Sequence, residues 1–139
     1  MTVWALLVVY QAKHFLADYP LQRAWMLGKF KPGWAWLWPL GAHAAVHGLF
    51  TLGIALWVQP SLWWLALVDF GIHGTVDRVK ASPNLLGRFK LAPMTAEELR
   101  GPDAAAKWKR NRWFWHTLGL DQMAHHLTHY YVIYRLVTA

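Results

Sequence analysis

The segment LWWLALVDFGIHGTVDRV (residues 62–79) is an apolar run that carries Asp69, His73 and Asp77 four positions apart. Four residues make about one turn of an α-helix, so these three side chains would lie on one helix face. Helices that span hydrocarbon keep ionisable residues only where these pair or carry out a function. The segment therefore predicts a membrane helix with a functional polar face.

Three other apolar stretches show the same spacing of His and Asp. Together the four stretches supply nine ligand-type side chains: His14, Asp18, His43, His47, Asp69, His73, Asp77, Asp121 and His125. Burying uncoordinated imidazoles and unpaired carboxylates in hydrocarbon is costly. We therefore expect these side chains to bind metal inside a helical bundle.

The composition agrees with a membrane domain. Of the 139 residues, 56% are apolar, 16% aromatic and only 15% charged, whereas soluble domains average about 25% charged residues. The length suits one domain, so residues 1–139 are predicted to form a single integral membrane domain. Because the chain contains no Cys, any metal must bind through nitrogen and oxygen.

The apolar stretches approach the roughly 20 residues that a membrane span needs. Their predicted limits are residues 3–21, 34–58, 62–79 and 113–137. The predicted fold is therefore all-α, a four-helix transmembrane bundle. The first stretch lacks a basic start and a cleavage motif, so it is expected to be a retained helix rather than a signal peptide.

Lys and Arg residues predict the orientation. They occur in the first connection (Arg23, Lys29 and Lys31) and throughout the third (about residues 80–112), whereas the second has none. The positive-inside rule then places both basic connections in the cytoplasm and both termini outside. The predicted location is the bacterial inner (cytoplasmic) membrane, as a multi-pass protein.

Within the third connection, residues 95–98 have the form of a helix capping box, and residues 104–112 are expected to extend the last helix as a basic stalk. The alternative to a membrane protein is a soluble helical bundle that binds nucleic acid through this basic loop. Trp residues at the expected span ends are typical of interfacial belts and count against it, so no nucleic-acid partner is predicted.

The predicted orientation places all four polar sets in the cytoplasmic half of the membrane, roughly 5 to 20 Å deep. Nine donors exceed a single tetrahedral zinc site, so we expect two or three divalent ions with bridging Asp carboxylates. A sulfur-free set of His and Asp suits zinc, which is favoured, and also iron or manganese.

Residues beside the polar sets have predicted supporting roles. Gln22 and Gln122 would orient the ligands by hydrogen bonding. Lys80 is the best candidate ion-pair partner of Asp77, three positions away. Lys13 is expected to point away from the site.

Three further His residues are weaker candidates for metal ligands. His126 lies about 100° around the helix from His125 and is not expected to serve the same centre. His129 is a candidate ligand of lower weight, and His116 is expected at the membrane interface.

Several of these motifs resemble a known pattern. They are HFLADYPLQ (residues 14–22), His43-x3-His47-Gly48, Asp69-x3-His73-x3-Asp77-x2-Lys80 and Asp121-Gln122-x2-His125. Together they resemble an uncharacterised family of small bacterial and phage integral membrane proteins, a domain of unknown function. The resemblance implies a membrane protein with few helices and no established activity. The pattern is also distantly similar to predicted membrane-bound metal-dependent hydrolases.

The leading functional hypothesis is a metal-dependent hydrolase that acts on an ester or phosphoester at the cytoplasmic leaflet. Lys80, Arg78 and Arg23 would lie near its mouth and could hold an anionic lipid head group. Alternatives are a di-iron oxidase resembling desaturases, a metal or proton carrier, and a metal-stabilised phage or bacterial membrane effector. The lipid bilayer is the expected partner, and self-association stays open.

Overall fold

The computed structural model describes residues 2–31, 33–82, 85, 101–103 and 112–139. Every regular element in these residues is helical, and none of them forms a strand, which confirms the all-α prediction. The α-helices are α1 (Val3–Asp18), α2 (Leu37–Val58), α3 (Leu65–Ala81) and α6 (Arg112–Thr138), and the 3-10 helices are η1 (Ala24–Phe30) and η2 (Pro60–Leu62).

The helix limits follow local chemistry. The Thr2 side chain caps α1 by accepting a hydrogen bond from the Ala5 backbone N–H at 3.2 Å, as expected for a helix N-cap. α1 ends at Asp18, before the expected limit at residue 21, because Pro20 has no N–H to continue the helical hydrogen bonds. The predicted capping box and most of the predicted basic stalk and loop lie outside the described residues.

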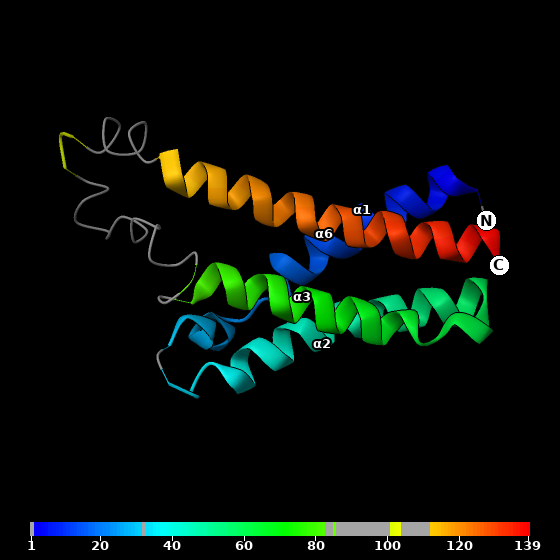
Figure 1. Ribbon diagram of the computed structural model, residues 1–139, viewed down its shortest axis with the longest axis horizontal. Helices are drawn as coiled ribbons and strands as arrows, with labels where there is room; N and C mark the ends of the chain where they lie inside the picture. Colours follow the sequence, from blue (N-terminus) through cyan, green and yellow to red (C-terminus); the bar gives the residue numbers. More distant parts are fainter. Residues whose placement is uncertain (1, 32, 83–84, 86–100, 104–111) are drawn as a thin grey trace.

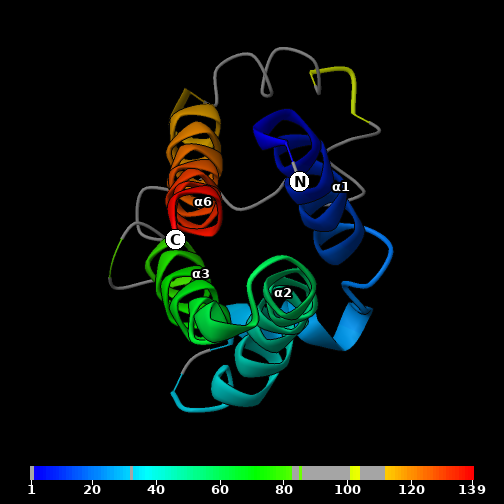
Figure 2. The ribbon, with the colours of Figure 1, turned by 90° about the vertical axis from the view of Figure 1, so that its right-hand side faces the viewer.

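The four α-helices alternate in direction and surround a common axis (Figures 1 and 2). Both termini and η2 lie at one end of the bundle, which we call the terminal end, whereas η1, the end of α3 and the start of α6 lie at the opposite, basic end (Figure 1). α1 contacts both α2 and α6, while α3 contacts α2 and α6. This is the up-down-up-down arrangement of a four-helix bundle.

α2 and α3 approach closely where Gly48 lies. A Cβ atom at Gly48 would be 3.2 Å from both the Ala66 backbone oxygen and the Phe70 Cβ. Small residues allow such close helix contacts in membrane bundles. The close approach brings the polar faces of α2 and α3 together.

The interior has two parts. An apolar core fills the terminal end and consists of Leu6, Tyr10, Ile54, Ala55, Leu62, Leu65, Val132, Ile133 and Leu136. Towards the basic end, the buried side chains are mainly His, Asp and Lys. The bundle is therefore apolar at one end of its interior and strongly polar at the other.

Among the described residues, one helix, α2, is long and apolar enough to cross a membrane by length and composition. α1 and α3 have 16 and 17 residues, short of the roughly 20 of a full span. α6 has 27 residues, but its His, Asp and Arg residues reduce its apolar character. The helical bundle is confirmed, and four membrane crossings stay a prediction.

Candidate metal centre

Six of the nine predicted ligands converge into two groups that can each hold a metal ion. Within each group, one ligand atom from every residue lies within 4.8 Å of the others. Group one consists of Asp18, His43, His47 and His73, and group two of His73, Asp77 and His125. His73 belongs to both groups, and all four α-helices contribute at least one member.

Asp18 joins α1 to group one. Its Oδ1 atom lies 3.0 Å from His47 Nε2 and 3.4 Å from His43 Nε2. Its Oδ2 atom lies 3.0 Å from Nε2 of His14, one helical turn earlier. His14 is thus a neighbour of group one through the carboxylate rather than a member of it.

The two carboxylate oxygens of Asp77 lie near different groups. Its Oδ2 atom lies 3.5 Å from His43 Nε2, while its Oδ1 atom lies 3.6 Å from His125 Nε2. A carboxylate whose two oxygens face different ligand sets has the geometry of a bridging ligand in a two-metal site. Asp77 and His73 therefore link the groups into one centre.

The imidazole rings are packed tightly. The ring centroids of His47 and His73 are 3.5 Å apart, and those of His73 and His125 are 4.1 Å apart. The Nε2 atoms face the shared centre, whereas the buried Nδ1 atoms of His14, His43, His47 and His73 have no hydrogen-bond partner among the described residues. A cation between the Nε2 atoms would use several of their lone pairs at once.

Three lysines, the buried Lys13 and Lys29 and the half-buried Lys80, pair with three of the four candidate Asp ligands. Lys29 Nζ lies 2.5 Å from Asp77 Oδ2, Lys13 pairs with Asp69, and Lys80 pairs with Asp121. The predicted ion pair between Lys80 and Asp77 is therefore wrong. Among the described residues, Asp18 differs from these three because its ionic contacts are all with His.

Lys13 does not point away from the interior, contrary to expectation, because it is only 2% exposed. It follows Tyr10 by three positions and precedes Ala17 by four, and both of these residues are buried. This 3-4 spacing is the signal that could have identified Lys13, since a buried helix face is wide enough for adjacent residues. Lys29, in a basic connection expected to lie in the cytoplasm, had no comparable signal.

Asp69 lies in a second polar cluster, outside both groups. Thr51 Oγ1 donates a hydrogen bond to Asp69 Oδ2 at 2.6 Å. Lys13, its ion-pair partner, also lies 3.4 Å from His129 Nε2. A lysine ammonium therefore occupies the place beside Asp69 where sequence reasoning expected a metal. Coordination by Asp69 stays a prediction.

The remaining predicted residues lie around this centre. Asp121 is outside the groups, but its Oδ1 atom is 3.6 Å from His125 Nε2. Gln122 Oε1 lies 3.3 Å from His14 Nε2, and its amide donates to Asp121 Oδ2 at 3.3 Å. Gln122 is thus placed to orient both neighbours, whereas Gln22 is half-buried after the end of α1.

The three weaker candidate His ligands lie in different surroundings. His129 is buried and contacts Lys13. His126 is half-buried, and its ring centroid is 5.7 Å from that of His14. His116 is exposed near the start of α6.

No known protein family, curated protein or solved structure matches this chain.

The chemistry available to the site follows from its donors. Three imidazoles with a carboxylate, next to a second set that shares one imidazole, suit zinc and other borderline divalent ions.

Proposed function

We propose that this is an integral membrane protein that binds two divalent metal ions and hydrolyses an ester or phosphoester bond of a lipid-like substrate at the cytoplasmic leaflet. The observation that carries the proposal is the pair of buried ligand groups that share His73. In two-metal hydrolases, the metals acidify a water and stabilise the attacking and leaving oxygens. Zinc is the favoured ion.

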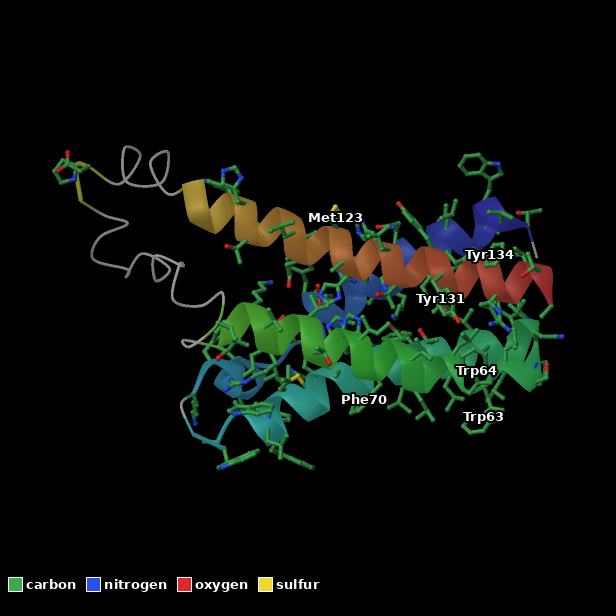
Figure 3. The ribbon with its side chains drawn as sticks, in the orientation of Figure 1. Trp63, Trp64, Phe70, Met123, Tyr131 and Tyr134 are labelled. Carbon is green, nitrogen blue, oxygen red and sulfur yellow. The ribbon has the colours of Figure 1, made fainter. Side chains whose placement is uncertain are left out.

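The surface of the bundle supports its location in a membrane. Trp63 and Met123 point away from the helices (Figure 3) and are 52% and 53% exposed. The ionisable side chains of the centre lie inside, between the helices. Polar residues inside and large apolar residues outside are the pattern expected when lipid surrounds a bundle.

Helix length is compatible with this location. At 1.5 Å per residue, α1 and α3 are about 25 Å long, a few ångströms below the usual hydrocarbon thickness. Bilayers accommodate short helices by local thinning at a modest cost. α1, α3 and α6 carry ionisable residues such as Lys13, His73 and Asp121, which are buried between the helices and lower the apolar character of these three helices.

A cleft between α3 and α6 supports a hydrolytic role. It has a volume of about 210 Å³, and Lys80 and Asp121 line it beside apolar residues. Because Asp121 Oδ1 lies 3.6 Å from His125, the cleft reaches the edge of group two. An ester group could approach the centre sideways from the lipid, with Lys80 near a phosphate.

The apolar core favours a catalytic role for the protein over transport through the bundle. It fills the interior at the terminal end, where Leu6, Leu65 and Val132 are fully buried. A hydrated path through the whole bundle would need polar residues there as well. The polar centre is therefore closed towards the terminal end, as expected for a site that serves one leaflet.

Metal analysis of the purified protein tests the proposal. Wild-type protein in detergent should contain two divalent ions per chain, one for each group, and should hydrolyse short-chain ester or phosphoester substrates in a metal-dependent way. His116→Ala, at an exposed position, is the control. Substoichiometric metal that His73→Ala does not change would disprove the metal centre. Iron with oxygen-dependent turnover would favour the di-iron alternative.

A further inference from the structure

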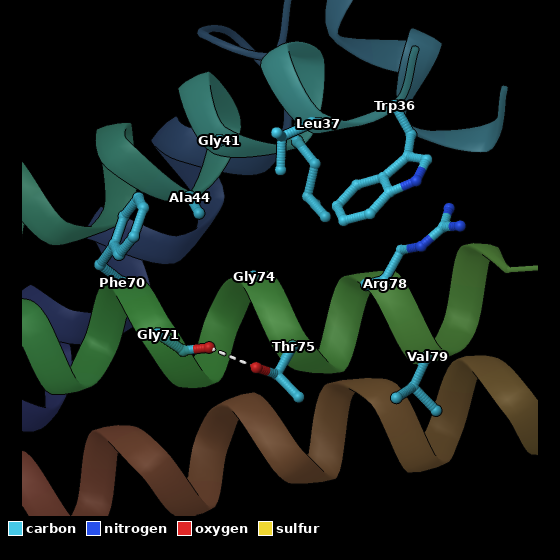
Figure 4. Close-up of a pocket in the computed structure, with 11 residues that line it drawn as sticks. Trp36, Leu37, Gly41, Ala44, Phe70, Gly71, Gly74, Thr75, Arg78 and Val79 are labelled. Carbon is cyan, nitrogen blue, oxygen red and sulfur yellow. Dashed lines mark hydrogen bonds between the residues drawn. The ribbon is translucent and has the colours of Figure 1, made fainter. Parts of the chain in front are cut away.

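A groove runs along the outer face of the bundle between α2 and α3, away from the metal centre. It has a volume of about 320 Å³. Its floor includes Gly41, Ala44 and Gly74, with Phe70 towards one end and Arg78 with Trp36 at the other (Figure 4). The groove is thus apolar along its length and cationic at one end.

Arg78 is the unusual member of this groove. Its guanidinium carbon lies 4.0 Å from the centre of the Trp36 ring. Its Nη1 atom is buried without a hydrogen-bond partner among the described residues. The adjacent carboxylate, Asp77, faces the interior and pairs with Lys29. No carboxylate of the described part of the chain pairs with Arg78, so its charge is available to a ligand, and guanidinium groups bind phosphate well.

We propose that this groove binds one anionic phospholipid, with its phosphate on Arg78 and an acyl chain running over Gly74 towards Phe70. Arg78 follows Phe70 by eight positions, which is about 12 Å along the helix, a length that suits part of an acyl chain. Arg78 lies close to the end of α3, at the basic end of the bundle. Anionic lipids of the cytoplasmic leaflet would meet it there.

This lipid is not the substrate of the proposed hydrolase. Gly74 and Arg78 line the groove, whereas His73 and Asp77 on the same helix are buried in the centre. The two sites thus use different faces of α3. The inference rests on the proposed membrane location, but it does not depend on metal binding or hydrolysis.

Native mass spectrometry tests the groove. Protein purified in mild detergent is mixed with equal amounts of phosphatidylglycerol and phosphatidylcholine, and the bound lipids are counted. We expect one phosphatidylglycerol to be retained preferentially. Arg78→Gln should weaken this retention roughly tenfold, because charge-assisted bonds to phosphate are strong. Lys31→Gln removes an exposed charge from the same end and should leave retention unchanged.

A second pair of variants tests the acyl-chain part. A Cβ at Gly41 or at Gly53 would meet no atom within 4 Å, so either residue can be enlarged without a direct clash. Gly41 lines the groove, and Gly53 is exposed later on α2. Gly41→Leu should reduce lipid retention with Arg78 still present, whereas Gly53→Leu should not.

Equal retention of the two lipids by the wild type, or equal retention by Arg78→Gln and Lys31→Gln, would overturn the proposal. Competition by inorganic phosphate as effective as that by phosphatidylglycerol would overturn a lipid as the occupant. Metal content measured on the same samples reports separately on the metal centre. Protein that stays in solution without detergent would instead refute the membrane location.

Discussion

The Nε2 atoms of His43 and His73 lie 3.2 Å apart across the interface of α2 and α3. One belongs to group one alone and the other to both groups, so this contact lies at the junction of the two candidate sites. Two neutral imidazoles can share one proton at this distance, but they cannot also satisfy the other Nε2 atoms that converge nearby. Metal ions provide a common partner for these atoms.

Removal of His73, which both groups share, should affect both sites. Removal of His125, which belongs to group two, should affect one. We expect His73→Ala to lower metal content to less than one ion per chain, because His73 belongs to both groups. His125→Ala should retain about one ion, since group one keeps its four donors. Elemental analysis after dialysis measures both variants. Equal losses would argue against two distinguishable sites.

Lys13 should stabilise the fold rather than the metal centre. Removing one partner of a buried ion pair costs about 3–5 kcal/mol, so Lys13→Met should lower the free energy of unfolding by about that amount. The double variant Lys13→Met/Asp69→Leu should regain much of the loss, because no unpaired charge remains. Denaturation in mixed micelles provides the measurement.

The same variants decide whether Asp69 coordinates a metal. If Asp69 contributes only to the pair with Lys13, the double variant keeps the wild-type metal content. A loss of one ion in that variant would restore Asp69 as a ligand and would indicate a third site.

Lys29 should compete with metal for Asp77. Its Nζ atom lies 2.5 Å from Asp77 Oδ2, the oxygen that also faces His43. Lys29→Gln should therefore tighten metal binding at this carboxylate while lowering stability, because Asp77 loses its ammonium partner. Lys31→Gln, at an exposed position of the same connection, is the control. Weaker metal binding in Lys29→Gln, measured by competition with a chelator, would contradict the expected competition.

The outward face of α2 should be sensitive to charge at its middle and tolerant at its end. Leu49 lies near the middle of α2 and is 66% exposed, and Leu37 begins the helix and is 54% exposed. A lysine at the centre of a membrane helix costs about 2.5–3.5 kcal/mol on insertion scales, and less near the interface. Leu49→Lys should therefore reduce membrane insertion more than Leu37→Lys.

Alkaline extraction of membranes from expressing cells measures this difference. In a soluble bundle, both exposed substitutions would change stability by about 0.5 kcal/mol or less. Equal and small effects of the two variants would thus count against the membrane location.

The helices were largely predictable because their signals are local. Apolar stretches and the turn at Pro20 set the limits of α1, and the observed ends of α2 and α3 differ from the predicted ends by up to three residues. The i, i+4 spacing also predicted which His and Asp share a helix face, since that follows from 3.6 residues per turn. Most of the candidate ligands therefore followed from the sequence alone.

The pairing between helices was decided only by the tertiary structure. Asp77 pairs with Lys29, 48 positions earlier, rather than with Lys80, three positions later, which instead reaches across to Asp121 on α6. Spacing fixes the face of one helix, but the partner depends on how neighbouring helices are rotated and how closely they approach, as at Gly48. The sequence by itself thus determined an all-helical chain with aligned His and Asp faces. Packing alone decided which Asp residues meet lysine and which meet histidine.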